Sequence, residues 1–572
     1  MSSILEKAKQ KRKFLARDLQ ITSWDDVRPY YEQLLAFPIC SDADMKQFLA
    51  MRSELESAME EDMSWRYIKM TCNTADESLR ESFNVFVTEI SPEADTFSNK
   101  LDKKCLDSPF FNNLDGDYDI MKRALQQREE LFREENVPII ADLQTMEQVY
   151  GSISSQMTIE YEGTKTMQQA SIYLKNVDRN VREKVFRMMQ NRRVQDETKL
   201  NDNLSQMIAK RHQVALNAGF ENYRDYKFKK LCRFDYTKED CFAFHDAIRK
   251  SVPPLMAKCN KERKQKLNLQ VLRPWDMDVD PDNLQPLKPF SDAKDFVAKA
   301  IACFTEIKPF YGECLQKLAD NGCWDLESRI GKAPGGYNNP LYESNLPFIF
   351  MNAAGTLHDV ETIVHEGGHA IHSIVSANLP LVDFKDLPSE VAELASMSME
   401  LISMEHWHTF FPNETDLKRA KKSQLDGVLS VLPWIAIIDK FQHWLYENPT
   451  HSIEQREKTW MSILDEFASG EGADWTGLEM YKKCSWQKQL HIFEVPFYYI
   501  EYGFAQLGAI AMWKQYKENP TKALENYEAF MKLGYTKSIP EIYKTAGIKF
   551  NFSYDYVMNL TKFVSAEIEK LR

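Results

Sequence analysis

The sequence lacks several features that mark whole classes of protein. It has no continuous apolar stretch of the roughly 18 residues that a membrane-spanning helix requires. Its first residues are charged and lack the apolar core of a secretory signal. Its ten cysteines include no C-x-x-C pair, which favours reduced and mostly buried thiols. We therefore expect a cytoplasmic protein that does not span a membrane.

Basic residues are outnumbered by acidic ones. Lys and Arg number 72 against 85 for Asp and Glu, which gives a net charge of −13. No sustained basic patch interrupts this balance, so we expect no nucleic-acid partner. With 43% hydrophobic residues, only 20 Gly and 23 Pro, and a length of 572 residues, the composition is that of a globular protein with a large core. The sequence does not determine an oligomeric state.

Helical spacing of apolar residues dominates the chain. It is clearest at residues 45–70, 182–219 and 521–534, where apolar residues recur every three or four positions with charges between them. The sequence Asn217-Ala218-Gly219 predicts the C-terminal cap of the second of these helices.

A polar stretch, KNVDRN, suggests a division of the chain near residue 180. We expect residues 1–180 to form an N-terminal helical lobe and residues 181–572 to form the larger, catalytic part. No convincing repeat of 20 to 50 residues runs through either part.

Three segments depart from helical spacing. Residues 157–176 alternate and contain β-branched and aromatic residues, which predicts a small hairpin. Residues 267–291 hold four prolines and four aspartates and predict a loop or linker. Residues 347–352, PFIFMN, predict a short strand directly before a cluster of histidines.

That cluster contains the motif H-E-x-x-H, formed by His365, Glu366 and His369. Residues four apart on a helix project from one face, so the two imidazoles can bind one ion. Zinc binds neutral imidazole and keeps an open position at catalytic sites, and a neighbouring carboxylate can act as a general base toward a water molecule. The motif therefore predicts a metallopeptidase centre with Glu366 as the base.

The surroundings of the motif argue against the alternative, an ordinary helix with a histidine pair on its surface. Val360, Ile363, Val364 and Ile371 make the helix apolar on several sides, so it is expected to be buried. Gly367 and Gly368 each cost a helix about 1 kcal/mol relative to Ala. Two such glycines suggest that another element approaches the backbone closely at that point.

A third metal ligand is expected from a second helix that begins after Pro388, with Ser389 as its N-cap. Its carboxylates are Glu390, Glu393 and Glu400, and spacing alone does not choose among them. Glu393 and Glu400 share a face, so one can bind the metal while the other supports a ligand. Glu361 lies four residues before His365 and is another candidate support.

A last cluster of polar aromatic residues lies near the C-terminal end: His491, Tyr498, Tyr499 and Tyr502. Phenol hydroxyls and a histidine near a metal-bound carbonyl would supply the hydrogen-bond donors that peptide hydrolysis needs. The alternative is an aromatic core stripe. The sequence alone leaves both readings open.

These motifs together resemble the thimet oligopeptidase and oligoendopeptidase F family of zinc metallopeptidases. The resemblance rests on DVETIVHEGGHAIH (359–372), EVAELASMSMEL (390–401) and HIFEVPFYYIEYGFAQ (491–506), with GGY (335–337) and PFIFMNAAGT (347–356) before them. The last of these segments looks closest to bacterial Pz-peptidase-like oligoendopeptidases. The resemblance is ordered over about 330 to 510, and the first 180 residues add little beyond compatible helicity.

The resemblance implies a role for each matching residue. His365, His369 and Glu393 match the ligands of one zinc ion per chain, and Glu366 matches the general base. Ser396 and Glu400 complete the family's E-x-x-S-x-x-x-E stretch, and Glu361 matches a support of the first histidine. His491, Tyr498, Tyr499 and Tyr502 match donors to the substrate carbonyl and the transition state. The sequence departs from the family at Gly367, where a bulky residue is common.

By the same resemblance the fold is mainly α, a two-lobed helical clam with a deep substrate channel and a small β-sheet beside the zinc site. The strand at 347–352 would be the edge that pairs with the substrate backbone. The expected activity is hydrolysis of internal bonds in short unfolded oligopeptides. The alternatives are a zinc carboxypeptidase or dipeptidyl carboxypeptidase, which needs a cationic anchor for a terminal carboxylate, and a non-catalytic peptide-binding protein of the same fold.

Overall fold

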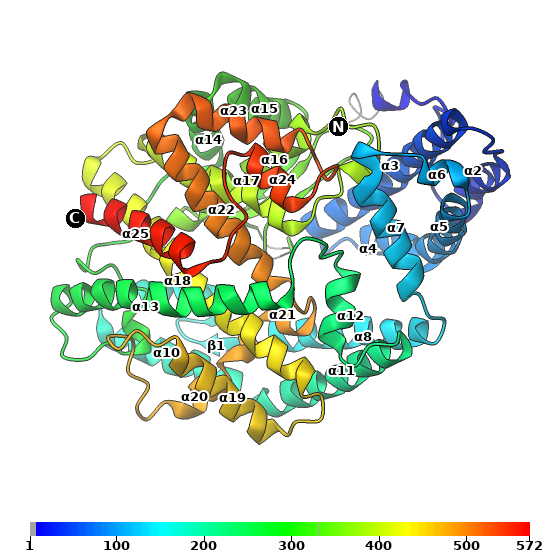
Figure 1. Ribbon diagram of the computed structural model, residues 1–572. Helices are drawn as coiled ribbons and strands as arrows, with labels where there is room; N and C mark the ends of the chain where they lie inside the picture. Colours follow the sequence, from blue (N-terminus) through cyan, green and yellow to red (C-terminus); the bar gives the residue numbers. More distant parts are fainter. Residues whose placement is uncertain (1–6, 330, 334, 572) are drawn as a thin grey trace. The chain divides into compact units, whose positions relative to one another are not determined.

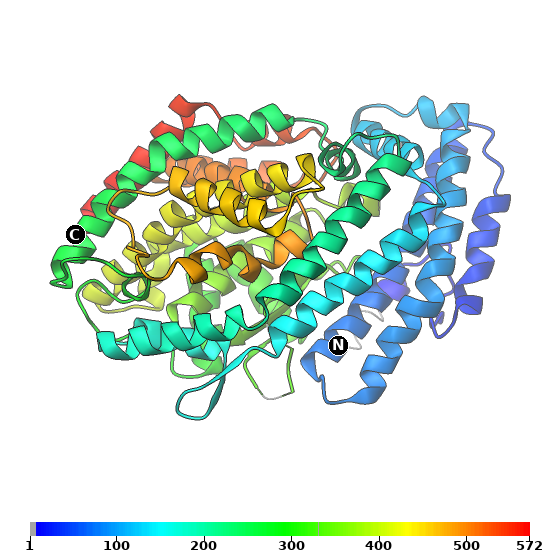
Figure 2. The ribbon, with the colours of Figure 1, turned by 90° about the horizontal axis from the view of Figure 1, so that it is seen from below.

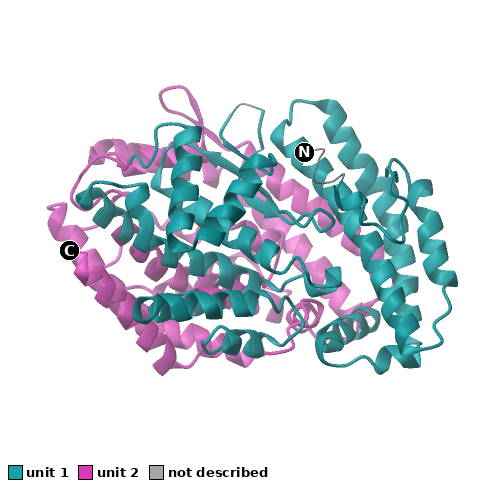
Figure 3. Cartoon of the chain, turned by 90° about the horizontal axis from the view of Figure 1, so that it is seen from above, with its two compact units in different colours: residues 1–130, 288–421, 508–550 teal, residues 131–287, 422–507, 551–572 magenta. Residues whose placement is uncertain are grey.

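Helices make up most of the chain in the computed structural model, which describes residues 7–329, 331–333 and 335–571 (Figure 1). The described chain divides into two compact units, each assembled from three separate segments (Figure 3). The first unit comprises residues 1–130, 288–421 and 508–550, and the second comprises 131–287, 422–507 and 551–572. The division near residue 180 stays a prediction. Among the described helices, none is both long and apolar enough to cross a membrane.

The first unit contains a helical N-terminal portion and a portion in which helices accompany a small sheet. Its helices are α2 (Trp24–Ala36), α3 (Asp42–Cys72), α4 (Glu77–Val85), α5 (Ser91–Leu106), α6 (Pro109–Asn112), α7 (Asp119–Leu131, whose last residue falls in the second unit), α14 (Ala293–Ile307), α15 (Pro309–Asp320), α16 (Leu357–Val375), α17 (Ser389–Ser403), α23 (Pro520–Met531) and α24 (Ile539–Thr545). Its strands are β3 (Trp324–Glu327), β4 (Tyr337–Asn339) and β5 (Phe348–Ala353).

The second unit is helical apart from one hairpin. Its helices are α8 (Asn136–Ser155), α9 (Met167–Ser171), α10 (Arg179–Val194), α11 (Glu197–Asn217), α12 (Tyr223–Lys230), α13 (Lys238–Lys266), α19 (Ile453–Glu466), α20 (Glu479–Lys483), α21 (Leu490–Phe493) and α25 (Tyr554–Lys570). The hairpin strands are β1 (Thr158–Glu160) and β2 (Thr164–Thr166). Two long helices, α18 (Glu414–Glu447) and α22 (Tyr499–Glu518), contribute residues to both units.

The helices expected at 45–70 and 521–534 are confirmed as α3 and α23. The helical spacing at 182–219 is also confirmed, although the chain there forms two helices, α10 and α11, separated at residues 195–196. Asp196 is the N-cap of α11, and its carboxylate pairs with Arg192 at 2.5 Å and Lys199 at 2.8 Å. The C-terminal end of α11 agrees with expectation, because Ala218 is the C-cap and Gly219 follows it with φ +84°.

The sequence places the hairpin and one strand of the second sheet, but not β3 or β4. β1 and β2 pair antiparallel, so the expected hairpin is confirmed, although it is shorter than 157–176. The strand expected at 347–352 is confirmed as β5, but its expected place at a sheet edge is wrong. The order is β3-β5-β4, with β3 parallel and β4 antiparallel to β5. The loop expected at 267–291 contains only a short 3-10 turn at Pro274–Asp276.

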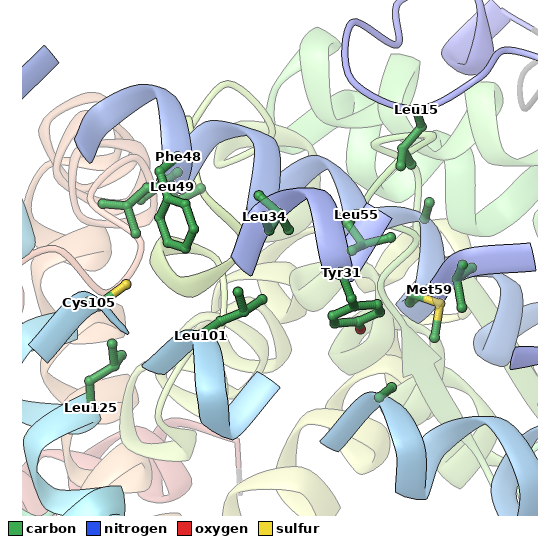
Figure 4. Packing of buried hydrophobic residues seen from close by; sticks show 14 of the residues in the cluster. Leu15, Tyr31, Leu34, Phe48, Leu49, Leu55, Met59, Leu101, Cys105 and Leu125 are labelled. Carbon is green, nitrogen blue, oxygen red and sulfur yellow. The ribbon is translucent and has the colours of Figure 1, made fainter. Parts of the chain in front are cut away.

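A hydrophobic core anchors the N-terminal helices of the first unit (Figure 4). Tyr31 and Leu34 from α2, Phe48 and Leu49 from α3, and Leu101 from α5 are all nearly inaccessible to solvent. Because these residues recur at helical spacing, each helix presents one continuous apolar face to the others.

In the second unit, α8 and α11 run alongside one another (Figure 2). Asn203 of α11 donates through Nδ2 to the carbonyl of Met146 in α8 at 3.1 Å, and Lys210 pairs with Asp142 at 2.7 Å. The pair thus has polar contacts in addition to its buried apolar residues.

Candidate metal centre

Helix α16 carries the H-E-x-x-H motif and begins at a well-defined cap. Thr356 is its N-cap, and the Asp359 carboxylate accepts hydrogen bonds from the backbone N–H groups of Thr356 at 2.7 Å and Ala354 at 3.0 Å. Val360, Ile363 and other apolar residues of α16 are completely buried, as the sequence predicts. Helix α16 therefore belongs to the interior of the first unit.

His365, His369 and Glu393 come together where α16 packs against α17. One donor atom from each of the three side chains lies within 4.8 Å of the others. Oε2 of Glu393 lies 3.3 Å from Nε2 of His365 and 3.7 Å from Nε2 of His369. Ligands around a tetrahedral zinc ion with bonds of about 2.1 Å stand about 3.4 Å apart, so this spacing suits one zinc ion.

Glu400 orients the first histidine. Nδ1 of His365 donates to Oε1 of Glu400 at 2.6 Å, so Nε2, which lies 3.3 Å from Oε2 of Glu393, is the nitrogen available to a metal ion. Glu361, the other candidate support, lies instead 3.3 Å from Nδ1 of His358, a mostly exposed residue. The structure thus places Glu400, and not Glu361, against His365.

The remaining carboxylates of α17 have different surroundings. Ser396 donates to Oε2 of Glu393 at 2.9 Å, and this bond fixes the carboxylate that faces the histidines. Glu390 is buried on the same helix, and its backbone carbonyl accepts from the Tyr543 hydroxyl at 3.0 Å. Ser389 is the first residue of α17 and the N-cap is Pro388, so the expected N-cap at Ser389 is wrong.

Burial and mutual contacts shift the protonation equilibria of this centre. Burial lowers the pKa of His369 to about 4, which favours the neutral imidazole that a metal requires. Burial opposes protonation of His365, but contacts with Glu393 and Glu400 outweigh it and raise its pKa. Burial would raise the pKa of Glu393, but the contact with His365 lowers it to about 2. Without a metal, the centre thus holds an anionic Glu393 carboxylate beside a neutral His369 and a His365 whose protonated form is favoured, and a bound cation would take the place of that proton.

The side chain of Glu366 takes no part in the contacts among His365, His369 and Glu393. Its side chain is buried, and its Oε2 has no hydrogen-bond partner among the residues that the structure describes. Burial raises the pKa of Glu366 to about 7. A carboxyl group with a pKa near neutrality can both accept and release a proton at physiological pH. The Asn338 side chain of β4 donates to the Glu366 backbone carbonyl at 3.3 Å, which ties the sheet to the motif.

The two glycines of the motif mark close approaches, as the sequence predicts. A Cβ atom added at Gly368 would lie 2.7 Å from the Cα of Ser396 and 3.0 Å from the carbonyl oxygen of Ala395. A Cβ atom at Gly367 would lie 2.3 Å from the ring of Phe304. Gly368 therefore allows α17 to approach α16 closely enough for Glu393 to reach the histidines.

The second unit brings together the aromatic residues that the sequence singles out. The His491 ring lies 4.6 Å from the ring of Tyr499, 5.9 Å from Tyr502 and 6.0 Å from Tyr498. The chain turns sharply before α22, because buried Phe497 adopts φ 69°. Tyr498 therefore precedes the helix, although its ring still lies 5.3 Å from that of Tyr502.

A chain of two hydrogen bonds determines the tautomer of His491. The sequence did not suggest this chain. Trp434 donates through Nε1 to Oε1 of Gln489 at 2.9 Å, and Nε2 of Gln489 lies 2.7 Å from Nδ1 of His491. An indole nitrogen can only donate, so Gln489 presents its amide N–H to Nδ1 and the ring hydrogen resides on Nε2. Burial lowers the pKa of His491 to about 4, so the ring is neutral. Gln489 lies two residues before His491, a spacing that carries no recognisable signal.

Comparison with protein-family models gives two matches. Residues 172–561 match the Peptidase family M3 model, and residues 14–145 match the Peptidase M3 N-terminal domain model. Between them the two models cover most of the chain.

Individual relatives agree with these matches. The chain is 24% identical over 477 residues to "Oligoendopeptidase F homolog" of Borreliella burgdorferi, covering 79% of this chain and 77% of the relative. It is also 24% identical over 326 residues to "Oligoendopeptidase F, chromosomal" of Lactococcus lactis subsp. cremoris, covering 56% of this chain and 52% of that relative.

Solved structures share the fold over nearly the whole chain. A structure described as Pz peptidase A with inhibitor 2 superposes with a TM-score of 0.89 at 23% identity, covering 98% of this chain and 99% of that one. A putative oligoendopeptidase F superposes with a TM-score of 0.88 at 24% identity, covering 98% of each chain. Since the Peptidase family M3 match spans more than half of the sequence, the chain belongs to Peptidase family M3 and is a metalloendopeptidase.

Proposed function

We propose that this peptidase is a zinc-dependent oligoendopeptidase that hydrolyses internal bonds of short, unfolded oligopeptides. The observation that carries the proposal is the convergence of His365, His369 and Glu393 at separations that suit one zinc ion. The similarity to two oligoendopeptidase F proteins supports an oligopeptide substrate.

His365, His369 and Glu393 would hold the ion, with Glu400 orienting His365 through its Nδ1–H. A zinc ion bound there supplies Lewis acidity toward the scissile carbonyl and toward the attacking water. Glu366 accepts the proton of that water and later delivers it to the leaving amine. Burial of Glu366, with its pKa of about 7, suits both halves of this exchange.

His491 and the tyrosines Tyr498, Tyr499 and Tyr502 serve, in this proposal, as donors to the substrate carbonyl and to the transition state. The tautomer of His491 supports the assignment, because Gln489 occupies Nδ1 and leaves an N–H at Nε2. The ring contacts among the four residues are equally compatible with packing, so their test is kinetic.

The sheet offers a place for an extended substrate. β5 is paired on both sides and cannot accept another strand. The outer strand that carries Asn338 is β4, so we place the substrate along the edge of β4. Asn338 contacts the backbone of Glu366, so an added strand on β4 would lie close to the proposed base.

The decisive experiment combines metal analysis with peptide cleavage. Glu366→Gln should keep its zinc and bind peptide, yet cleave it more slowly by roughly 10²–10⁴-fold, the usual contribution of a general base. His369→Ala and Glu393→Gln should each remove one zinc ion per chain, whereas Glu390→Gln should keep it.

Glu361→Gln is the matched control for the base, because Glu361 lies on the same helix and contacts His358. Wild-type cleavage by Glu366→Gln, or zinc retained by Glu393→Gln and lost by Glu390→Gln, would contradict the assigned roles.

A further inference from the structure

A second group of metal-ligating side chains lies in the second unit, away from the H-E-x-x-H motif in sequence. Cys241 and His245 stand four residues apart on α13, and Asp439 and His443 stand four residues apart on α18. Residues at this spacing share one helix face. The exposed fractions of these residues are 0% for Cys241 and Asp439, 5% for His245 and 3% for His443.

The donor atoms of this group are close together. One donor atom each of Cys241, Asp439 and His443 lies within 4.8 Å of the other two. Two ligands of the same tetrahedral zinc ion stand about 3.4 Å apart for nitrogen or oxygen pairs and about 3.6 Å apart when one ligand is sulfur. The most distant pair would therefore have to approach by up to about 1 Å, a shift that rotation of the side chains can supply.

The fourth member of the group, His245, forms a hydrogen bond with the carboxylate of Asp439. Its Nε2 lies 2.8 Å from Oδ2 of Asp439. A carboxylate oxygen can only accept, so the Nε2–H of His245 donates to Oδ2 of Asp439. A histidine in this position holds the carboxylate in place, as residues behind metal ligands commonly do.

Polar atoms in this group lack partners although they are buried. Neither ring nitrogen of His443 nor Oδ1 of Asp439 has a hydrogen-bond partner among the described residues. Nε2 of His443 approaches Oδ2 of Asp439 to 3.2 Å, but without the geometry of a hydrogen bond. The rings of Phe242, Phe497 and Phe228 surround His443, with centroids 4.9, 5.3 and 5.7 Å away. Burying polar groups unsatisfied is unfavourable, and a bound cation would offset that cost.

We propose that Cys241, Asp439 and His443 bind a second divalent transition-metal ion, with His245 positioning the Asp439 carboxylate. One thiolate and one carboxylate neutralise a divalent cation, so the filled site would carry no net charge inside the protein. A mixed sulfur, nitrogen and oxygen donor set suits zinc. Because the ligands come from α13 and α18, the ion would link these two helices and serve stability. This second site is independent of the proposed peptidase mechanism.

Cobalt substitution tests the proposal on the wild-type protein. Co²⁺ bound to a thiolate gives an intense near-ultraviolet charge-transfer band, and the His365, His369 and Glu393 set contains no sulfur. The metal-depleted chain loaded with Co²⁺ should show this band and bind two ions. His369→Ala should bind one ion and keep the band, whereas Cys241→Ser should bind one ion and lose it.

Cys303→Ser is the matched control, because Cys303 is an equally buried cysteine in the first unit, and it should keep the band. A wild-type protein that binds Co²⁺ without the band, or a band that survives in folded Cys241→Ser, would overturn the proposal. The absence of the band from the wild-type spectrum would overturn the proposal even if a variant failed to fold. Loss of peptidase activity has no bearing on either outcome.

Discussion

At the scale of single residues, Gln489 offers the most specific test of the proposed catalytic role of His491. Its amide is oriented by Trp434 and donates to Nδ1 of His491. Gln489→Met removes both bonds while keeping a side chain of similar length. The His491 ring is then free to place its hydrogen on Nδ1, so we expect kcat to fall with little change in KM. The loss should approach, without exceeding, the roughly hundred- to thousandfold effect of removing one transition-state donor.

Nuclear magnetic resonance of ¹⁵N-labelled histidine measures the tautomer directly. The wild-type spectrum should show the hydrogen of His491 on Nε2, and His491→Ala identifies the signal. An unchanged kcat in Gln489→Met, Tyr498→Phe, Tyr499→Phe and Tyr502→Phe alike would indicate that this cluster is core packing.

At the scale of secondary-structure elements, the contact between α16 and α17 depends on Gly368. Gly368→Ala would force its Cβ against the backbone of Ser396 and Ala395, which cannot rotate away. We expect the free energy of unfolding to fall by about 1–3 kcal/mol, the usual cost of overpacking. Zinc affinity should also fall, because separating the helices moves Glu393 from the histidines.

Gly427→Ala is the matched control. Gly427 also lies within a helix, α18, but a Cβ atom there would meet nothing within 4 Å. This variant should be as stable as the wild type or more stable by about 0.4–1 kcal/mol. Equal urea midpoints for the two variants would show that the glycine does not set the helix spacing.

The strand β3 is held by an ion-pair group that makes stability depend on pH. Asp325 pairs with Arg329 at 2.6 Å and with Lys332 at 2.8 Å. Burial would raise the pKa of Asp325, but these hydrogen bonds lower it to about 2, below the usual 3.8. The unfolded chain thus binds the proton more tightly. The stabilisation is complete above pH 3.8 and is lost as the pH falls through about 2.

Asp325→Asn should therefore lower the free energy of unfolding near neutrality by about 1 kcal/mol, after allowing for solvent screening. The difference from the wild type, measured as a urea midpoint, should shrink as the solution is acidified. Asp18→Asn, at an exposed position, serves as the control. A difference that stays constant into acid would show that the ion pairs contribute nothing.

At the scale of the whole molecule, the proposed endopeptidase and the carboxypeptidase alternative differ in where along a peptide they cut. An endopeptidase does not need the terminal carboxylate, so a peptide amidated at its C-terminus should be cleaved at the same internal bond as its free acid. We expect the two kcat/KM values to agree within a few-fold. Cleavage confined to the free acid, near its C-terminal end, would instead indicate the carboxypeptidase alternative with a cationic anchor.

Local patterns in the sequence determined much of this protein. Apolar spacing predicts α3 and α23, alternation predicts the β1–β2 hairpin, and the H-E-x-x-H spacing places both histidines on one face of α16. These features depend on neighbours within a few residues, whose geometry is set by helix and strand periodicity. The cytoplasmic location and the catalytic roles of His491 and the tyrosines stay predictions.

Only the tertiary structure decided how distant residues meet. Spacing left Glu390, Glu393 and Glu400 equivalent, but the close packing of α17 on Gly368 brings Glu393 to the histidines and Glu400 to Nδ1 of His365. The tertiary structure likewise places β5 in the centre of its sheet. It also brings Cys241 together with Asp439 and His443. Such contacts depend on the relative position of whole helices, which is set by the packing of many side chains and leaves no local pattern in the sequence.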